Sequence, residues 1–193
     1  MKVGLYFGSF NPIHAGHLII VNHILNETEL KKVWLVVSPQ NPLKSSSTLL
    51  NEYDRIHLAK LATEGDTRIL VSDIEFKLPR PSFTVDTLTY LAEKYPELEF
   101  SIIMGGDSYQ NLPKWKNYEV IVKNYPIYVY KRIGYDIVPH FGIAPHVLNA
   151  PLIEISSTAI RKLIEEGKSV RYLLPDKVNE EIEENRYYRK KLK

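Results

Sequence analysis

The chain has 193 residues, of which 44% are hydrophobic and 25% are charged, values typical of a folded globular protein. Its formal net charge of +2 is too small for the basic excess of a nucleic-acid-binding protein, and the absence of cysteine excludes disulfides and thiolate metal ligands. Residues 1–10 lack a signal-peptide core, and no apolar run reaches the length of a membrane span. We therefore expect a cytoplasmic protein with neither a membrane nor a nucleic acid as its partner.

The first part of the chain predicts a strand, a helix and a second strand. An apolar run over residues 2–7 ends at Gly8, as in a strand followed by a turn. Residues 15–27 place apolar side chains at helical spacing, and residues 33–37 form a β-rich apolar run typical of a strand buried on both faces. Residues 38–47, rich in proline, serine and asparagine, predict a long exposed loop.

The remaining segments continue this alternation. We expect helices over residues 51–64 and 84–94, and strands over residues 68–74, 98–104 and 127–130. Two helical pieces are expected from residue 157 onward. Such alternation predicts parallel βαβ units with right-handed crossovers. The expected fold is therefore α/β, a Rossmann-like doubly wound parallel sheet of five or six strands. We expect one domain over residues 1–193, with residues 155–193 as a helical C-terminal segment.

Ligands of such sheets bind beyond the carboxyl ends of the strands, which directs attention to the loops at residues 8–16, 38–47 and 105–109. In the first loop, Gly8 permits a turn and a close approach of backbone to ligand. The helix that begins near Ala15 points its N-terminus at the same place, where free N–H groups and the helix dipole favour phosphate. Because the dipole contributes only about 0.3–1 kcal/mol, phosphate binding needs further donors.

His14 and His17 are the candidate donors. Three residues apart at a helix start, they can both face the loop, and imidazole N–H groups donate to phosphate oxygens, more strongly when protonated. A lone His-x-x-His pair more often makes ordinary polar contacts, and no third metal ligand of the usual type lies nearby in sequence. The Gly-x-Gly-x-x-Gly pattern of dehydrogenases is absent here. As a ten-residue unit after the first strand, the segment favours a phosphate site without direct side-chain ligation of a metal.

A second candidate phosphate site lies near the other end of the chain. Ser156, Ser157 and Thr158 precede a predicted helix, where hydroxyl groups either cap the N-terminus or donate to an anion bound there. Arg161 follows one turn later and can fork onto two phosphate oxygens. Taken alone, this segment is more simply a helix cap with a surface arginine. In company with the two histidines, a shared triphosphate site is the favoured interpretation.

Both segments resemble known signatures. Residues 8–17 resemble the signature loop of the HxGH nucleotidyltransferase superfamily, and residues 155–161 resemble its second motif, Ser-Ser-Thr-x-Ile-Arg. Between them, residues 38–44, 81–88 and 104–108 resemble segments of the bacterial nicotinate-nucleotide adenylyltransferase family. The resemblance to this family therefore covers nearly the whole chain.

The resemblance implies adenylyl transfer from ATP to nicotinate mononucleotide, giving deamido-NAD and pyrophosphate in NAD biosynthesis, with Mg²⁺ accompanying ATP. It implies three catalytic residues, His14, His17 and Arg161. ATP would be bound by these three residues together with Gly8, Ser9, Phe10, Gly105, Asp107, Ser156, Ser157 and Thr158. The mononucleotide would be bound by Asn11, Lys44, Thr84, Trp115 and Arg132. In the family, backbone groups around the threonine matching Thr84 receive the nicotinate carboxylate, the tryptophan contacts the pyridine ring, and an arginine resembling Arg132 lies near the adenine.

Alternatives stay open for single residues and for the whole chain. Thr84 also suits a plain helix start, Trp115 suits core packing, and Lys44 suits a solvated loop. Met104 and the double glycine after it depart from the family pattern, and residues 132–151 lack the motif expected for adenine contacts. Two other functions compete with this one. The chain could be an adenylyltransferase for nicotinamide mononucleotide or phosphopantetheine, or a non-catalytic nucleotide-binding regulatory protein. The sequence decides neither acid over amide preference nor the formation of a homo-oligomer.

Overall fold

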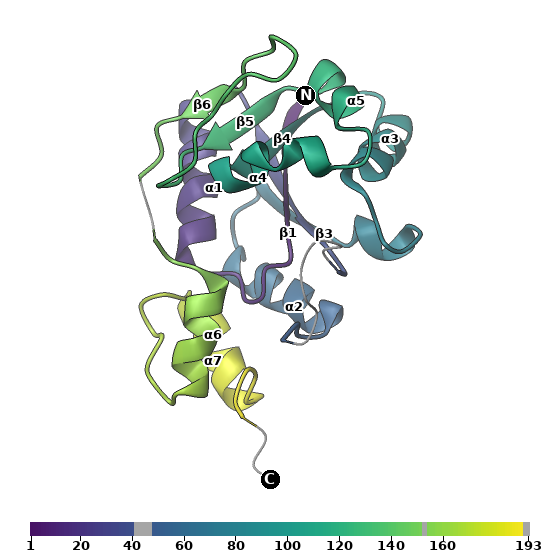
Figure 1. Cartoon of the computed structure of the whole chain (residues 1–193). Coiled ribbons are helices and arrows are strands. Elements are labelled where there is room, and N and C mark those ends of the chain that lie inside the picture. The colour runs from purple at the N-terminus through teal and green to yellow at the C-terminus, as the bar shows by residue number, and fades with distance from the viewer. Residues whose placement is uncertain (41–47, 152–153, 191–193) are drawn as a thin grey trace.

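A computed structural model describes residues 1–40, 48–151 and 154–190. Within them, six strands form one parallel sheet in the order β3-β2-β1-β4-β5-β6 (Figure 1). The strands are β1 (Lys2–Gly8), β2 (Lys32–Val37), β3 (Ile69–Ser72), β4 (Glu99–Gly105), β5 (Ile127–Tyr130) and β6 (His146–Leu148). The order reverses between β1 and β4, which places a topological switch point beside the first loop. The predicted Rossmann-like doubly wound sheet is confirmed.

Helices cover both faces of the sheet (Figure 1). They are α1 (Ala15–Glu27), α2 (Glu52–Ala62), α3 (Thr84–Lys94), α4 (Gly106–Gln110), α5 (Tyr118–Asn124), α6 (Ser157–Glu165) and α7 (Asp176–Glu184), with 3-10 turns η1 (Ile74–Lys77) and η2 (Leu112–Lys114). No helix of the described ranges is long and apolar enough to cross a membrane.

The predicted elements are present; apart from the 3-10 turns η1 and η2, three short helices and strands were not predicted. Strand β3 ends earlier than expected because the Ile74 N–H donates to the Ser72 hydroxyl at 3.3 Å and turns the chain into η1. The unpredicted elements are β6, α4 and α5. β6 has three residues at the sheet edge with two of them exposed, so it lacks the continuous apolar run of a buried strand.

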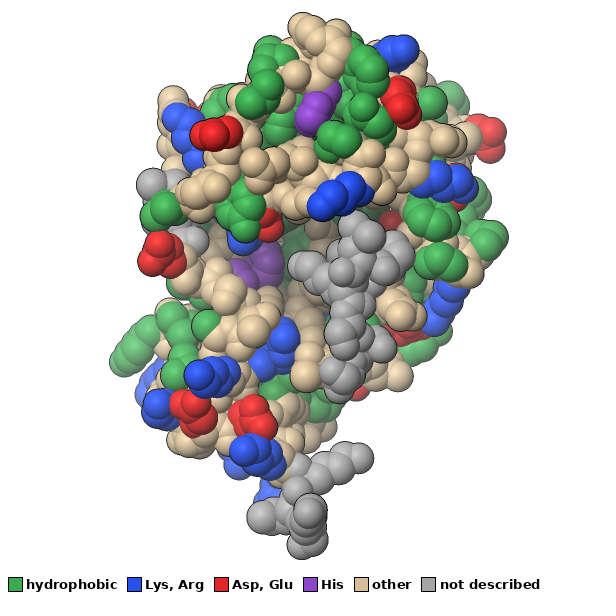
Figure 2. All heavy atoms as spheres, in the orientation of Figure 1, with side chains coloured by type: hydrophobic (Ala, Val, Ile, Leu, Met, Phe, Trp, Pro, Cys, Tyr) green, Lys and Arg blue, Asp and Glu red, His purple; other side chains and the backbone are tan. Residues whose placement is uncertain are grey.

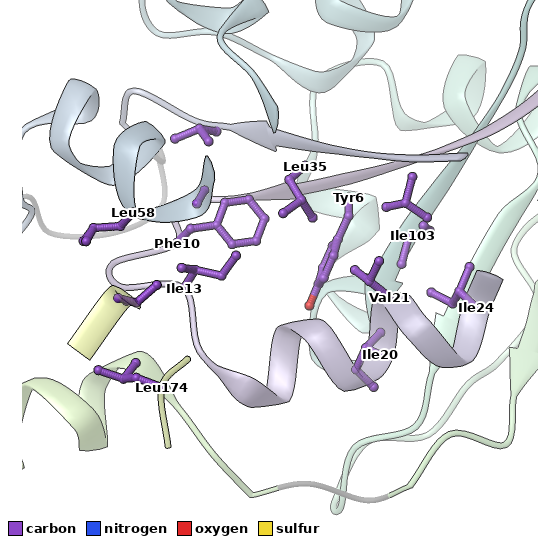
Figure 3. Close-up of a cluster of buried hydrophobic side chains, with 14 of the residues drawn as sticks. Tyr6, Phe10, Ile13, Ile20, Val21, Ile24, Leu35, Leu58, Ile103 and Leu174 are labelled. Atoms are coloured by element: carbon purple, nitrogen blue, oxygen red, sulfur yellow. The ribbon is translucent and has the colours of Figure 1, made fainter. Parts of the chain in front are cut away.

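Two hydrophobic cores lie on opposite faces of the sheet, because successive side chains of a strand point to opposite faces. On β2, Leu35 belongs to one core and Trp34 to the other. The first core packs Tyr6 and Leu35 against the inner face of α1, and Phe10 and Ile13 extend it toward the C-terminal helices (Figure 3).

The C-terminal helices belong to the first core. Ile160, Val178 and Ile182 are buried there, and α7 packs against α2. The Tyr188 hydroxyl donates to the Asn11 side-chain oxygen at 2.9 Å, which ties the end of the described chain to the first loop. These contacts place the second sequence motif beside the first, although the two are separated by most of the chain.

Candidate active site

A cleft of about 690 Å³ opens at the carboxyl ends of β1, β4 and β5. Figure 2 shows it as a hollow in the middle of one face, with a histidine visible inside it and Lys or Arg side chains beside it. The predicted site residues of the described chain all line this cleft: Gly8, Ser9, Phe10, Asn11, His14, His17, Thr84, Gly105, Asp107, Trp115, Arg132, Ser156, Ser157, Thr158 and Arg161. Lys44 lies outside the described residues.

His14 and His17 stand at the first turn of α1, where the sequence predicts them. His14 is the N-cap residue, and its ring stacks on that of His17 with centroids 3.7 Å apart. The backbone N–H of His14 donates to Nδ1 of His17 at 3.2 Å. Since a neutral imidazole carries one proton, this contact leaves that proton on Nε2 of His17, where it can be donated to a ligand oxygen.

Burial changes the charge state of both rings. It lowers the pKa of His14 from 6.5 to about 4, with the positive charge of Arg132 acting in the same direction. Burial, His14 and Arg132 together hold the pKa of His17 well below its usual value. Both histidines are therefore neutral at pH 7 in the free protein and can offer neutral N–H groups, whereas the sequence left their protonation open.

The second motif is hydrogen-bonded directly to the first loop. The Ser157 hydroxyl donates to the Pro12 carbonyl at 2.9 Å, and Nη1 of Arg161 donates to the Asn11 carbonyl at 2.7 Å. Nη2 of Arg161 lies 3.3 Å from the Thr158 hydroxyl oxygen. Ser156 caps α6 by accepting from the Ala159 N–H at 3.2 Å. The cap predicted from sequence is present. Arg161 contacts the first loop and lines the cleft, so it is not merely a surface arginine.

At the opposite side of the cleft, α3 begins at Thr84 with no capping side chain among the described residues. The N–H groups of Thr84 and Val85 are therefore available to an anionic group, because the first turn of a helix leaves them without intrahelical partners, whereas the Asp86 N–H donates to the Phe83 carbonyl at 3.0 Å. Glu75, 3% exposed, lies beneath this helix start and accepts hydrogen bonds from Ser82 at 3.1 Å and from Thr87 at 3.0 Å. Burial raises the pKa of the Glu75 carboxyl.

The ends of β4 and β5 carry a linked set of polar groups. Nε of Arg132 lies 3.3 Å from the Asp107 carboxylate, and Nη2 of Arg132 lies 3.4 Å from the Tyr130 hydroxyl, which bonds the Tyr6 hydroxyl at 3.0 Å. Gly105 makes this packing possible, since a Cβ there would lie 2.5 Å from the Asp107 side chain and 3.0 Å from Nε of Arg132. Arg132 is thus held on the cleft wall by contacts with Asp107, which follows β4, and with Tyr130, which ends β5.

Sequence reasoning missed Glu75 and Arg55 as contributors to the site. Arg55 is fully buried and donates to the carbonyls of the first two loops. Its position offered a signal, because Arg55 is one turn before Ala59 on the apolar side of a predicted helix, where a charge is unusual. Glu75 offered none, since it stands in an irregular segment between a strand and a helix.

The family model described as cytidylyltransferase-like matches residues 5–163. The probable nicotinate-nucleotide adenylyltransferase of Flavobacterium johnsoniae is 54% identical, with 98% of this chain and 100% of the relative covered. The chain belongs to the nicotinate-nucleotide adenylyltransferase family. A Bacteroides thetaiotaomicron member with the same name is 44% identical over 95% of this chain and 92% of its own length.

Solved structures of this family share the fold. Plasmodium falciparum nicotinic acid mononucleotide adenylyltransferase complexed with NaAD superposes with a TM-score of 0.80 at 19% identity, covering 97% of each chain. A Vibrio parahaemolyticus nicotinate-nucleotide adenylyltransferase structure gives a TM-score of 0.74 at 21% identity, covering 99% of this chain and 97% of its own. The adenylyltransferase fold is thus retained where most residues differ.

Proposed function

We propose that this protein transfers the adenylyl group of ATP to nicotinate mononucleotide, giving deamido-NAD and pyrophosphate in cytoplasmic NAD biosynthesis. The observation that carries the proposal is the meeting of two phosphate motifs in one cleft, with Ser157 and Arg161 hydrogen-bonded to the loop that carries His14 and His17. Relatives named for this reaction match nearly the whole chain.

The reaction needs alignment more than a general base. An oxygen of the mononucleotide phosphate forms a bond to the α-phosphorus of ATP, and the bond from that phosphorus to the oxygen bridging the α- and β-phosphates breaks. Because the attacking phosphate is already ionised at neutral pH, the protein contributes positioning and stabilisation of charge. The neutral rings of His14 and His17 serve as fixed N–H donors to the α- and β-phosphates, next to the N-terminus of α1.

The leaving pyrophosphate is assigned to the start of α6. The Thr158 hydroxyl is exposed in the cleft, and Arg161 has guanidinium N–H groups beyond those that contact Asn11 and Thr158. A guanidinium binds phosphate oxygens in a bidentate manner and stays charged throughout the reaction. Arg161 therefore both fixes the first loop and offers charge to the leaving group.

The pyridine side supports the acid as the substrate. The uncapped N–H groups around Thr84 suit a carboxylate better than an amide, because a helix start favours negative charge. Trp115, half-buried on the cleft wall, offers a flat apolar face to the ring. We therefore assign nicotinate, rather than nicotinamide, mononucleotide as the preferred acceptor.

Mg²⁺ fits this cleft as an ion that enters with ATP. The described residues contain no cluster of three or more His, Asp or Glu side chains able to hold a metal, and the cleft carboxylates are Glu75 and Asp107. Mg²⁺ keeps several waters and is usually held by substrate phosphates with one or two carboxylates. Asp107 is the residue that would hold it, and the ion would neutralise developing charge on the phosphates.

The test is pyrophosphate release from ATP and Mg²⁺ with nicotinate and nicotinamide mononucleotide measured in parallel. We expect turnover with the acid and a higher KM with the amide. Replacing His17 with Ala should lower kcat by about 100- to 1,000-fold, the usual effect of removing one donor to transition-state charge. His23→Ala on the same helix is the control, because His23 does not line the cleft. Absence of pyrophosphate release with both mononucleotides would contradict the assignment.

A further inference from the structure

Arg55, in the first turn of α2, is a charged side chain with no exposed surface. Its guanidinium donates four hydrogen bonds to backbone carbonyls: Nε to Leu50 at 2.9 Å, Nη1 to Ser9 at 2.6 Å and to Ser38 at 2.8 Å, and Nη2 to Pro39 at 2.9 Å. All three nitrogens are therefore used, and all by main-chain oxygens.

This cation has no carboxylate partner among the described residues. Glu52, on the same helix, pairs instead with Arg80 at 2.5 Å. A buried charge without an opposite charge is costly even when it is hydrogen-bonded, and Arg55 remains protonated although burial lowers its pKa. A hydrophobic residue at this position would leave the carbonyls of Leu50, Ser9, Ser38 and Pro39 without these donors. The buried charge is therefore tied to the backbone of the loops that it holds.

The four carbonyls belong to the segments that frame the cleft. Ser9 and Ser38 follow the ends of β1 and β2, which are paired at Gly8 and Val37. The Ser38 N–H also donates to the Gly8 carbonyl at 2.9 Å. One guanidinium thus joins the loops after two neighbouring strands at the point where both leave the sheet.

The Ser9 contact also acts on a strained residue. Phe10 has φ of +43°, in the left-handed region that costs an L-residue about 1–2 kcal/mol. Nη1 of Arg55 holds the carbonyl of the residue just before it, and the Phe10 ring packs against the His17 ring with centroids 5.1 Å apart. The guanidinium therefore helps to hold the backbone from which the histidine donors receive their orientation.

We propose that Arg55 is a positioning residue for adenylyl transfer, which fixes the phosphate loop from behind through Ser9, Ser38 and Pro39. It does not line the cleft, so it acts through these carbonyls rather than by touching ATP. Its unpaired charge lies behind the loop where the triphosphate binds, so the bound anion offsets the cost of burying that charge. This inference rests on the proposed function and adds a residue to it.

The experiment compares Arg55→Lys and Arg55→Met with wild type, adds Arg55→Ala for chemical rescue by methylguanidinium, and uses Arg68→Lys as a matched control. Arg68 is a surface arginine whose guanidinium pairs with Asp66 at 2.8 Å, and it does not line the cleft. Lysine at position 55 keeps the charge but lacks the planar fork that reaches four carbonyls. The measurements are kcat and KM for both substrates, the thermal midpoint, and equilibrium binding of Mg²⁺ with a non-hydrolysable ATP analogue.

We expect Arg55→Lys to remain folded at the assay temperature and to lose about 100-fold in kcat, the scale of a small misplacement of reacting groups. Both variants should bind the ATP analogue more weakly, with KM for the mononucleotide nearly unchanged. In Arg55→Ala, added methylguanidinium should restore part of the rate. Arg68→Lys should match wild type in every measurement.

Folded Arg55→Lys with wild-type kcat and wild-type binding of the ATP analogue would overturn the positioning role. If only the thermal midpoint falls, Arg55 is structural and the inference is wrong. Should Arg55→Met fail to fold, Arg55→Lys and the rescue experiment decide. Wild-type protein that binds the ATP analogue but releases no pyrophosphate would refute the proposed function, while weaker analogue binding by the Arg55 variants would still support the positioning role.

Discussion

The buried His14 ring makes the stability of the free protein depend on pH in a calculable way. Its pKa is about 4 in the folded protein and 6.5 when unperturbed. Between these values the unfolded chain binds a proton that the folded chain does not, so stability falls as pH falls from about 6.5 to about 4. Each pKa unit corresponds to about 1.4 kcal/mol, so the fully developed loss is about 3 kcal/mol, of which about 2.5 kcal/mol is expressed at about pH 4.5.

Replacement of His14 with Asn removes this proton and keeps a polar side chain. We expect urea unfolding of the wild type to lose about 2.5 kcal/mol more than His14→Asn between about pH 7.5 and about pH 4.5. Carboxylates titrate in both proteins, so their contribution cancels in the difference. Asn22→Ala, at an exposed and non-titratable position of the same helix, is the control and should follow the wild type. Equal pH dependence of the wild type and His14→Asn would refute the reasoning.

Two further predictions concern the mononucleotide pocket and the C-terminal helices. Glu75→Gln should raise KM for nicotinate mononucleotide with little change in KM for ATP. The reason is that Ser82 and Thr87 both donate to the Glu75 carboxylate below the start of α3. Equal changes in both KM values would contradict this prediction. Ile160→Ala should lower the free energy of unfolding by about 2–5 kcal/mol in urea titrations, since this fully buried side chain joins α6 to the first core. A change below about 1 kcal/mol would show that the site collapses around the smaller residue.

Local patterns predicted most of the fold because its main elements are regular. The helix α3 has the predicted bounds, since its apolar side chains recur on one face, and β2 carries an unbroken apolar run over residues 33–37. α5 was missed because its seven residues include exposed Val120 and buried Ile121 and Val122, too few to establish a helical period. β6 exists because the edge of β5 offers it backbone partners, a property of the neighbouring strand rather than of its own residues.

The candidate site was likewise only partly predictable from local sequence patterns. His14 and His17 could be predicted from one ten-residue segment after the first strand, and both lie at the start of α1. Arg55 offered a signal in its unusual place on the apolar side of α2, but its contacts could not be predicted, because its partners Ser9, Ser38 and Pro39 lie 46, 17 and 16 residues away and contribute only backbone atoms. Every residue type has a backbone carbonyl, so the residue types at those positions do not indicate such a contact. Glu75 likewise depends on hydroxyl donors 7 and 12 residues later, which meet it only after η1 and the start of α3 have formed.

The hydrogen bonds from Arg161 and Tyr188 to Asn11 also concern the order in which the protein is made. They join residues 150 and 177 positions apart. A chain growing from its N-terminus can build β1, α1 and the first loop early, yet the Asn11 groups obtain these donors only after α6, α7 and Tyr188 have been synthesised. These contacts at Asn11 therefore form late in synthesis, by closing loops of 150 and 177 residues.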